Sequence, residues 1–275
     1  MAKVSIILPT YNGANFIAKA IESVSKQTFQ DWELLVLSDG SIDHTSSIVE
    51  QFSVADPRIT FIQNENNLGI QKTLNKGISL SSGKYIARID DDDRWINPNK
   101  ITQQVQYMEL HDDYVLVGTD ANIIDAAENL LSVNRMPKTD KEIRQKILSK
   151  NCFLHSTVLI RKSAIDVVGG YQENKNFLHA EDYEFWLRLG RVGKFCNLAL
   201  IGVQLTNHVQ SLTSKNRILQ AKNIFRMIKG YKKDYPNFLI GYLIARTRYA
   251  GFVFLKYIPM PKSLIFWIQR IYKKV

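Results

Sequence analysis

Residues 84–93 read KYIARIDDDD, a short β-prone run that ends in four consecutive carboxylates. Four adjacent anions repel one another, so folding them together is unfavourable unless a cation neutralises them. A strand that ends in Asp-x-Asp is well suited to hold a divalent metal, because Mg²⁺ and Mn²⁺ prefer oxygen ligands and often bind substrate phosphates as well. Taken alone, the run fits a solvated acidic turn equally well, so the flanking sequence has to decide.

The segments before this run alternate between apolar, β-branched stretches and stretches with helical spacing. The expected strands are residues 4–8, 33–37, 58–63 and 84–89, and the expected helices are residues 14–26, 44–53 and 68–80. Such alternation is typical of βαβ units around a parallel sheet. Ligands bind beyond the carboxyl ends of the strands in these sheets. We therefore expect the polar segments 10–12, 39–41 and 90–93 to meet in one crevice.

The middle of the chain is less regular and ends in a long basic segment. We expect helices over residues 98–110, 141–148, 180–189 and 216–233, and strands over residues 114–118 and 156–160. Residues 238–256 are strongly apolar but contain Arg246 and Arg248, and residues 264–271 are again amphipathic. These patterns predict an α/β body followed by a helical extension.

Composition describes an ordinary globular protein that needs no disulfides. The chain has 275 residues, of which 45% are hydrophobic and 23% charged. Its two cysteines, Cys152 and Cys196, do not have metal-ligand spacing, which fits a reduced, cytoplasmic setting. The N-terminus passes directly into a strand pattern without the apolar region of a signal peptide. No stretch reaches the roughly 18–20 uninterrupted apolar residues of a membrane span.

The net charge of +10 is unevenly distributed. Residues 215–275 contain 14 basic residues and one acid, Asp234, so they carry 14 − 1 = +13, and residues 1–214 carry 10 − 13 = −3. This asymmetry predicts an anionic surface as the partner of residues 215–275, and their apolar clusters favour the inner face of a cell membrane, bound peripherally, over a merely solvated face. A nucleic-acid partner is not expected, because no binding motif or interleaved aromatic platform is present.

Seven short motifs occur in a fixed order along residues 3–211. They are 4–12 (VSIILPTYN), 20–28 (AIESVSKQT), 38–43 (SDGSID), 67–77 (NLG and NKG), 90–93 (DDDD), 169–171 (GGY) and 181–182 (ED). In this order and spacing they resemble the motifs of family 2 glycosyltransferases. The resemblance implies the GT-A fold, which is a Rossmann-like, mostly parallel sheet flanked by helices. Residues 1–214 are then the catalytic domain, with a nucleotide-sugar half at about 1–95 and an acceptor half at about 96–214, and residues 215–275 are the basic helical extension.

The resemblance also implies a reaction. A sugar moves from a nucleotide-diphosphate sugar, with a UDP-sugar as the expected donor, to a saccharide or a lipid-linked saccharide in cell-surface polysaccharide biosynthesis. Mn²⁺ or Mg²⁺ on Asp92 stabilises the departing diphosphate, and Asp90 bridges to the ribose or to metal-bound water. Asp182 is the general base for the acceptor hydroxyl. A single displacement of this kind inverts the anomeric centre.

The donor-binding residues are also carried over from the resemblance. Asp39 would accept a hydrogen bond from the imide of the base, between loops that flank the base and ribose. The full expected set is Pro9, Thr10, Tyr11, Asn12, Asp39, Asn67, Gly69, Lys72, Asp90 and Asp91. The chain departs from the family pattern in two places. Ser38 replaces the first acid of the nucleotide motif, and Thr206 or Asn207 replaces an Arg that some members carry before a late histidine, here His208. His208 is expected to meet the metal or the diphosphate.

Several of these residues could instead have a purely structural role. Asp182 could instead cap a helix, and His155 reads more readily as a core or loop histidine than as a catalytic one. Trp95 is as compatible with core packing as with an acceptor wall. For Lys84 and Arg88, the sequence does not choose between a solvated role and one in phosphate steering.

Two other functions compete with glycosyl transfer. A sugar-phosphate nucleotidylyltransferase would also use an α/β nucleotide domain and Mg²⁺, but it requires a Gly-rich basic loop after the first strand, and residues 10–15 contain none. A non-enzymatic nucleic-acid-binding protein would account for the basic extension but not for the acidic run.

Overall fold

The computed structural model describes residues 2–207 and 216–257. The predictions for His208 and for residues 264–271 lie outside this part of the chain. The strands are β1 (Val4–Thr10), β2 (Trp32–Ser38), β3 (Ile59–Gln63), β4 (Tyr85–Arg88), β5 (Arg94–Trp95), β6 (Tyr114–Ile124), β7 (Leu130–Asn134), β8 (Leu159–Arg161) and β9 (Lys194–Thr206). The helices are α1 (Ile17–Ser25), α2 (Thr45–Ala55), α3 (Ile70–Leu80), α4 (Lys100–Leu110), α5 (Asp140–Lys146), α6 (Lys162–Val168), α7 (Glu181–Leu189), α9 (Arg217–Ile228) and α10 (Phe238–Tyr257).

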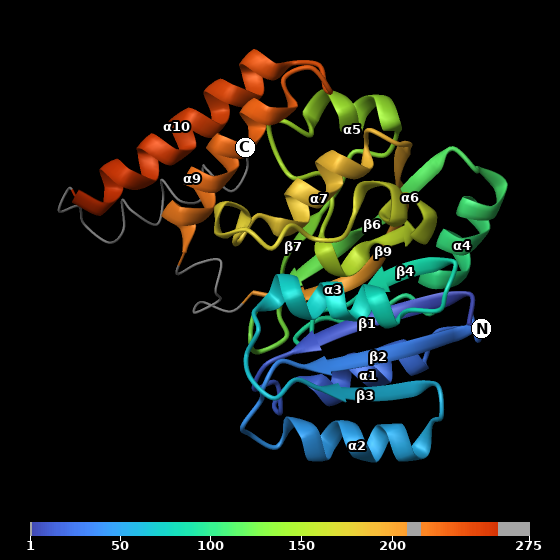
Figure 1. Cartoon of the computed structure of the whole chain (residues 1–275). Helices are drawn as coiled ribbons and strands as arrows, with labels where there is room; N and C mark the ends of the chain where they lie inside the picture. The colour runs from blue at the N-terminus through green and yellow to red at the C-terminus, as the bar shows by residue number, and fades with distance from the viewer. Residues whose placement is uncertain (1, 208–215, 258–275) are drawn as a thin grey trace.

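The first half of the chain forms the predicted βαβ layer. Strand β1 pairs in parallel with β2 and β4, and β2 pairs in parallel with β3. Along β1, Ile6 and Leu8 face the core beneath α1, whereas Ile7 faces the core that contains Leu74 of α3. The sheet is therefore covered on both faces, and Figure 1 shows α3 and α1 on its opposite sides. Thr10 lies opposite Ser38, so the polar ends of β1 and β2 share one edge, as predicted.

The second half of the sheet is mixed rather than parallel. The strand order is β3-β2-β1-β4-β8-β6-β9-β5, with β7 paired to β6. Strand β8 is antiparallel to both β4 and β6, while β9 is parallel to β6 and antiparallel to β5. The α/β class is confirmed, but parallel pairing prevails only among strands β1 to β4.

The strand predicted at residues 156–160 begins later than expected. Residues His155–Thr157 form a 3₁₀ turn, and the strand is β8. The hydroxyl and the amide of Thr157 both donate to the Leu154 carbonyl, at 2.7 and 2.9 Å. Such a local side-chain bond competes with strand pairing. As a result Ser156 is held at the end of β4, where it contacts the acidic run.

The described part of the C-terminal extension packs against α7. Helix α9 ends at Ile228 and continues as a 3₁₀ turn, η3 (Lys229–Tyr231), where a single helix to residue 233 was predicted. Met227, Tyr231 and Tyr235 belong to the same buried core as Trp186 of α7. Helix α10 lies against α9 at the periphery of the molecule (Figure 1). In the described residues it is the one helix long and apolar enough to cross a membrane.

Candidate active site

The loops after β1 and β2 are tied together where a nucleotide is expected. Asn12 adopts a left-handed backbone, with φ of 55°, which Asn tolerates better than most residues. Its amide donates to the Ser41 hydroxyl at 3.0 Å, and its side-chain oxygen accepts from the Ile42 amide at 2.9 Å. Tyr11 is 52% exposed beside this link, and Pro9 is buried within β1. The loop therefore presents an exposed aromatic ring on a fixed backbone.

Asp39 is buried and already has several hydrogen-bond partners. Its carboxylate accepts from the amides of Leu68 and Gly69, at 2.8 and 2.9 Å, and from Asn64 Nδ2 at 3.0 Å. Gly69 has φ of +88°, in the region that favours glycine, and its amide also reaches Asn67 Oδ1 at 3.1 Å. The structure thus gives Asp39 a role that the sequence did not suggest, which is to fix the turn before α3. Lys72 is exposed on that helix.

The four acids after β4 have four different environments. Asp90 is bound by both terminal nitrogens of Arg88, and the Nη1 contact is 2.6 Å long. Asp91 accepts from the Thr10 hydroxyl at 2.5 Å, and buried Asp93 accepts from Ser156 at 2.5 Å. The run is therefore folded into the strand ends and is not a solvated turn.

Glycine is required beside Asp91. A Cβ added at Gly13 would lie 2.3 Å from Asp91 Oδ2 and 2.4 Å from Thr10 Oγ1. Any side chain there would displace the bond between these two residues. The glycine thus permits the loop after β1 and the acidic run to approach closely.

Burial and mutual repulsion oppose the charged state of this run. Burial raises the pKa of Asp91 to about 7, and the charges of Asp92 and Asp90 add to the rise against the Thr10 hydrogen bond. Burial also raises the pKa of Asp93 well above its ordinary value, again with Asp90 and Asp92 contributing. A divalent cation would relieve this repulsion.

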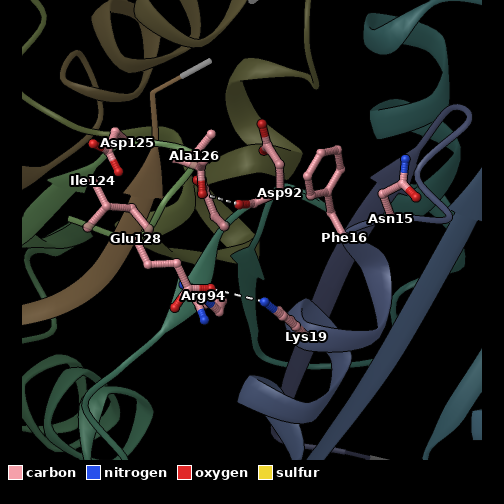
Figure 2. A pocket seen from close by; sticks show the side chains of 11 residues that line it. Asn15, Phe16, Lys19, Asp92, Arg94, Ile124, Asp125, Ala126 and Glu128 are labelled. Atoms are coloured by element: carbon pink, nitrogen blue, oxygen red, sulfur yellow. Dashed lines mark hydrogen bonds and ion pairs between the residues drawn. The ribbon is translucent and has the colours of Figure 1, made fainter.

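Asp92 lies at the edge of a cavity of about 220 Å³ (Figure 2). Its carbonyl accepts from the hydroxyl of Thr206, at the end of β9, at 2.9 Å. Across the cavity, Glu128 of the β6–β7 turn pairs with Lys19 of α1 at 2.9 Å and with Arg94 at 3.1 Å. The structure therefore places the end of β9, two residues before His208, beside the acidic run.

The donor set fits a hard metal that is shared with a substrate. Within the described ranges no group of three or more His, Cys, Asp or Glu side chains is arranged to hold a metal ion. Mg²⁺ is commonly bound by one or two carboxylates together with substrate phosphates, so a closed protein cage is not required. The carboxylate oxygens at residues 90–93 have the chemistry for that kind of site.

Asp182 is the second residue of α7 and does not cap it. The capping position is Ala180, whose side chain makes no capping bond, so the plainer reading of Asp182 is not observed. Asn151 Nδ2 donates to Asp182 Oδ2 at 2.8 Å, and burial raises the pKa of this carboxyl above its ordinary value. Next to it, burial and the charge of Asp182 raise the pKa of Glu181 to about 7. Two carboxyls thus stand at the start of one helix, in poorly solvated surroundings.

The GGY segment is fixed by the side chains of three residues. Arg188 of α7 donates to the carbonyls of Gly169 and Gly170, at 3.1 and 2.7 Å. Asn75 of α3 exchanges two hydrogen bonds with the Tyr171 backbone, at 2.7 and 2.8 Å. The Tyr171 hydroxyl meets His155 Nε2 at 2.7 Å. His155 therefore has a buried structural partner, in agreement with the plainer reading.

The structure also distinguishes between the alternative roles of the basic and aromatic residues near the acidic run. Arg88 is 4% exposed and neither solvated nor free to steer phosphate, because it is bound to Asp90. Lys84 is exposed and pairs with Glu109 at 2.8 Å, at the opposite end of β4 from the acidic run. Trp95 is buried, and its indole donates to the Ser156 carbonyl at 2.9 Å, so it is a core residue. Arg88 stands two residues before Asp90, and this spacing was the feature of the sequence that could have indicated their contact.

These features define an α/β sheet whose strand ends carry a nucleotide-type loop and an acidic run, with a half-buried pair of carboxyls at the start of helix α7. Residues 5–169 match the model of the family "Glycosyl transferase family 2", and the chain belongs to this family.

Relatives in other organisms agree with this assignment. The chain is 33% identical over 193 residues to the "Putative glycosyltransferase EpsE" of Bacillus subtilis, a match that covers 70% of this chain and 68% of the relative. It is 34% identical over 187 residues to the "UDP-Glc:alpha-D-GlcNAc-diphosphoundecaprenol beta-1,3-glucosyltransferase WfgD" of Escherichia coli, which covers 68% and 69% respectively.

Solved structures share the fold at low sequence identity. S. aureus TarS 1-349 superposes with a TM-score of 0.69 at 19% identity, covering 97% of this chain and 78% of that one. Its complex with UDP-GlcNAc gives a TM-score of 0.66 at 20% identity, with 91% and 71% covered. The mannosyltransferase PcManGT of Pyrobaculum calidifontis, in complex with GDP-Man and Mn²⁺, gives 0.64 at 15% identity, with 99% and 81% covered.

Proposed function

We propose that this glycosyltransferase is an inverting, metal-dependent enzyme that moves a sugar from a UDP-sugar to a saccharide or lipid-linked saccharide in surface polysaccharide biosynthesis. One observation carries the proposal. The acidic run at the end of β4 and helix α7 meet at one turn, because the Asp90 amide donates to the Ser156 hydroxyl at 3.0 Å and the neighbouring His155 packs on Trp186 of α7, with ring centroids 5.6 Å apart. A leaving diphosphate and an attacking hydroxyl need the carboxyls of the run and of α7 within one substrate's reach.

The donor lies across the ends of β1, β2 and β4. Tyr11 supplies an exposed ring for the base, and Asn12 and Thr10 line the ribose side. The Asp39 carboxylate retains a lone pair that its three donors do not use. It can therefore accept a hydrogen bond from the base and still fix the turn before α3. Asn67, Gly69 and Lys72 close the far side. The structure of TarS with UDP-GlcNAc supports a uridine nucleotide.

Mn²⁺ or Mg²⁺ is held by Asp92, with His208 as a second ligand. When bound, the metal supplies positive charge to the diphosphate as it leaves. Asp90 binds the ribose side, since Arg88 already occupies both of its oxygens and makes it a poor metal ligand. The Mn²⁺ complex of PcManGT supports this choice of metal.

Asp182 accepts the proton of the acceptor hydroxyl. Asn151 orients it, and burial raises its pKa toward the range in which a carboxylate is an effective base. One base acting in a single displacement leads to inversion. The name of WfgD, a transferase to a diphosphoundecaprenol-linked sugar, supports a lipid-linked acceptor.

The extension binds the inner face of the cell membrane peripherally. Leu239, Ile240 and Leu243 of α10 are 71%, 56% and 54% exposed, although they are large and apolar. Arg246 and Arg248 interrupt the apolar sequence of this helix, and a charge at mid-membrane costs at least about 2.5 kcal/mol. A helix in the interface accommodates both features, because its apolar side reaches the acyl chains and its basic side chains meet anionic headgroups.

A donor panel tests the reaction directly. The protein is incubated with UDP-, GDP- and dTDP-sugars, with Mn²⁺, Mg²⁺ or EDTA, and release of the nucleoside diphosphate is followed. The proposal expects release from a UDP-sugar that EDTA abolishes. Release of pyrophosphate from a sugar phosphate and a nucleoside triphosphate would instead support the nucleotidylyltransferase alternative.

A further inference from the structure

Another cavity lies between the loop before α7 and the C-terminal extension, apart from the one beside the acidic run. It measures about 480 Å³, and we call it the α9 pocket. Its walls come from the turn η2 (Lys175–Phe177), the residues after α7, helix α9 and the turn η3. They include Phe177, Tyr231, Arg191 and Arg226. The α9 pocket therefore combines two aromatic rings with two guanidinium groups.

Side chains of α9 hold the wall that is formed by the loop before α7. Asn223 is 2% exposed, and its Nδ2 donates to the carbonyls of Leu178 and Lys175, at 2.9 and 3.3 Å. Gln220 Nε2 donates to the His179 carbonyl at 2.8 Å. Because these amides satisfy the carbonyls of an irregular segment, they fix its backbone. The α9 pocket is thus preformed, and this wall leads directly into the start of α7.

Positive charge dominates the α9 pocket. Arg226 is exposed and forms no ion pair in the described part of the chain. Arg191 Nη2 pairs with Asp234 at 2.7 Å, yet 45% of the Arg191 side chain stays exposed. The Arg191 guanidinium lies 4.6 Å from the centroid of the Tyr231 ring, whose hydroxyl is held by Glu184. No Asp or Glu is among the described lining residues, so the pocket attracts anions.

A phosphate group matches this arrangement. Guanidinium groups offer paired N–H donors that fit two phosphate oxygens, and such charge-assisted bonds are stronger than neutral ones. The aromatic rings give the adjoining part of the ligand an apolar contact. The loops expected to hold the donor contribute none of the described lining residues, so the donor diphosphate is not the source of this phosphate.

The position of the α9 pocket links it to the acceptor. Its wall leads into α7, where Asp182 is the proposed base. Helix α9 lies between α7 and α10 (Figure 1), and α10 is the helix proposed to lie in the membrane interface. A lipid-linked acceptor has to extend from the membrane to the base, so the pocket lies on its path. Arg191 follows the far end of α7, roughly 13 Å from Asp182 at 1.5 Å per helical residue, a distance that a sugar joined to a diphosphate can bridge.

We propose that the α9 pocket binds the phosphate that joins the sugar to the lipid in a lipid-linked acceptor, with Arg226 and Arg191 as its ligands. This inference rests on the proposed function and narrows its acceptor to one that carries a phosphate. The phosphate stays in the pocket while the hydroxyl to be glycosylated reaches Asp182. The C-terminal extension then supplies part of the acceptor site as well as the surface that meets the membrane.

Calorimetry with inorganic pyrophosphate measures this site without turnover. The full chain is titrated in EDTA, because the metal-free acidic run repels pyrophosphate and binding then reports on the α9 pocket. Arg226→Gln should weaken the affinity by roughly 10- to 100-fold, the value of a hydrogen bond to a charged group. Arg217→Gln is the matched control. It removes the same charge from the same helix, about two and a half turns away and thus on the opposite face.

Three results would overturn the proposal. They are no pyrophosphate binding by the wild type, equal affinity in the wild type and Arg226→Gln, and an equal loss in Arg217→Gln and Arg226→Gln. Arg226 is exposed, so its substitution should leave the fold intact.

Vesicles distinguish the acceptor phosphate from an ordinary anionic headgroup. Co-sedimentation is compared between phosphatidylcholine vesicles that carry a polyprenyl diphosphate and phosphatidylglycerol vesicles. We expect Arg226→Gln to lose much more binding to the first than to the second, whereas an equal loss on both would assign the site to headgroups and overturn the acceptor role. The proposed function fails separately: a wild type that releases no nucleoside diphosphate in the donor panel refutes it, while unchanged pyrophosphate affinity in Arg226→Gln refutes only the α9 pocket.

Discussion

At the scale of single residues, the account depends on carboxylates that look alike in the sequence and differ in their surroundings. Asp90 is bound to Arg88, Asp91 to Thr10 and Asp93 to Ser156. Asp92 and Asp93 both line the cavity, and Asp92 also contacts Thr206 at the end of β9. This division of tasks could not be predicted from four identical letters, because it depends on which loops approach each side chain.

Asp92→Ala should greatly weaken Mn²⁺-dependent donor binding and abolish sugar transfer. The substitution removes the expected metal ligand and relieves repulsion within the run, so the fold should stay intact. Calorimetry with a UDP-sugar, with and without Mn²⁺, measures the effect. Asp112→Ala is the control, since that side chain is 92% exposed and distant from the run in sequence. Metal-dependent affinity that equals the wild type in Asp92→Ala would refute the metal assignment.

Asp182→Asn should reduce turnover by roughly 10²–10⁴, the usual contribution of general-base catalysis. The amide keeps the shape of the side chain and its contact with Asn151 but cannot accept the proton. Donor affinity should be nearly unchanged, because the residue acts on the acceptor. Steady-state kinetics and donor titration measure the two quantities. A variant that retains more than about a tenth of wild-type turnover, with chemistry rate-limiting, would contradict the role of base.

At the scale of elements, the sequence predicted the first half of the fold far better than the second. Strands β1, β2 and β4 are short apolar runs in which almost every residue is buried, and β1, β2 and β3 are each followed by a helix, so periodicity alone identifies this part of the fold. Strand β9 mixes buried residues such as Phe195 and Val203 with half-exposed ones, without clean alternation, and was not predicted. Strand β7 is almost wholly exposed and owes its structure to pairing with β6.

The site was likewise predictable in some of its features and not in others. The motifs at residues 10–12, 39–41 and 90–93 meet at one sheet edge, as the strand pattern predicted. The burial of Arg88 and the contact of Gly13 with Asp91 were not predictable, because both depend on elements that meet only in three dimensions. Position 13 shows this well, since the same glycine in an open turn would carry no such restriction.

The link between the extension and α7 is an element-level feature that can be measured. The buried Tyr231 hydroxyl donates to Glu184 Oε1 at 2.7 Å, and Glu184 also binds Arg188, which holds the GGY segment. Tyr231→Phe should lower the free energy of unfolding by about 1.5–3 kcal/mol, the value of a hydrogen bond to a charged group. Denaturant unfolding gives this number. A double-mutant cycle with Glu184→Gln that shows no coupling would contradict the link.

At the scale of the whole molecule, the charge asymmetry and the exposed apolar side of α10 predict that the protein binds a membrane with α10 against the lipid. Deleting residues 215–275 is a poor test, because Met227 and Tyr231 belong to the core that contains Trp186 of α7. Substituting serine for Leu239, Ile240 and Leu243 together removes the exposed apolar side and leaves that core untouched.

This triple variant should bind anionic vesicles much less than the wild type does in co-sedimentation. Wild-type binding should be stronger to anionic than to neutral vesicles and should fall with added salt, because headgroup attraction is screened. Ile42→Ser with Val54→Ser is the matched control, since both residues are 89% exposed on the nucleotide-sugar half. Equal wild-type binding to neutral and anionic vesicles would contradict the proposed surface.

The central claim is that one carboxylate, Asp182, drives a single displacement on a nucleotide sugar. Proton NMR of the first-formed product tests this claim most directly. With an α-linked UDP-sugar as donor, the account predicts a β-linked product from the wild type and no detectable early product from Asp182→Asn. A product that retains the α configuration would contradict it.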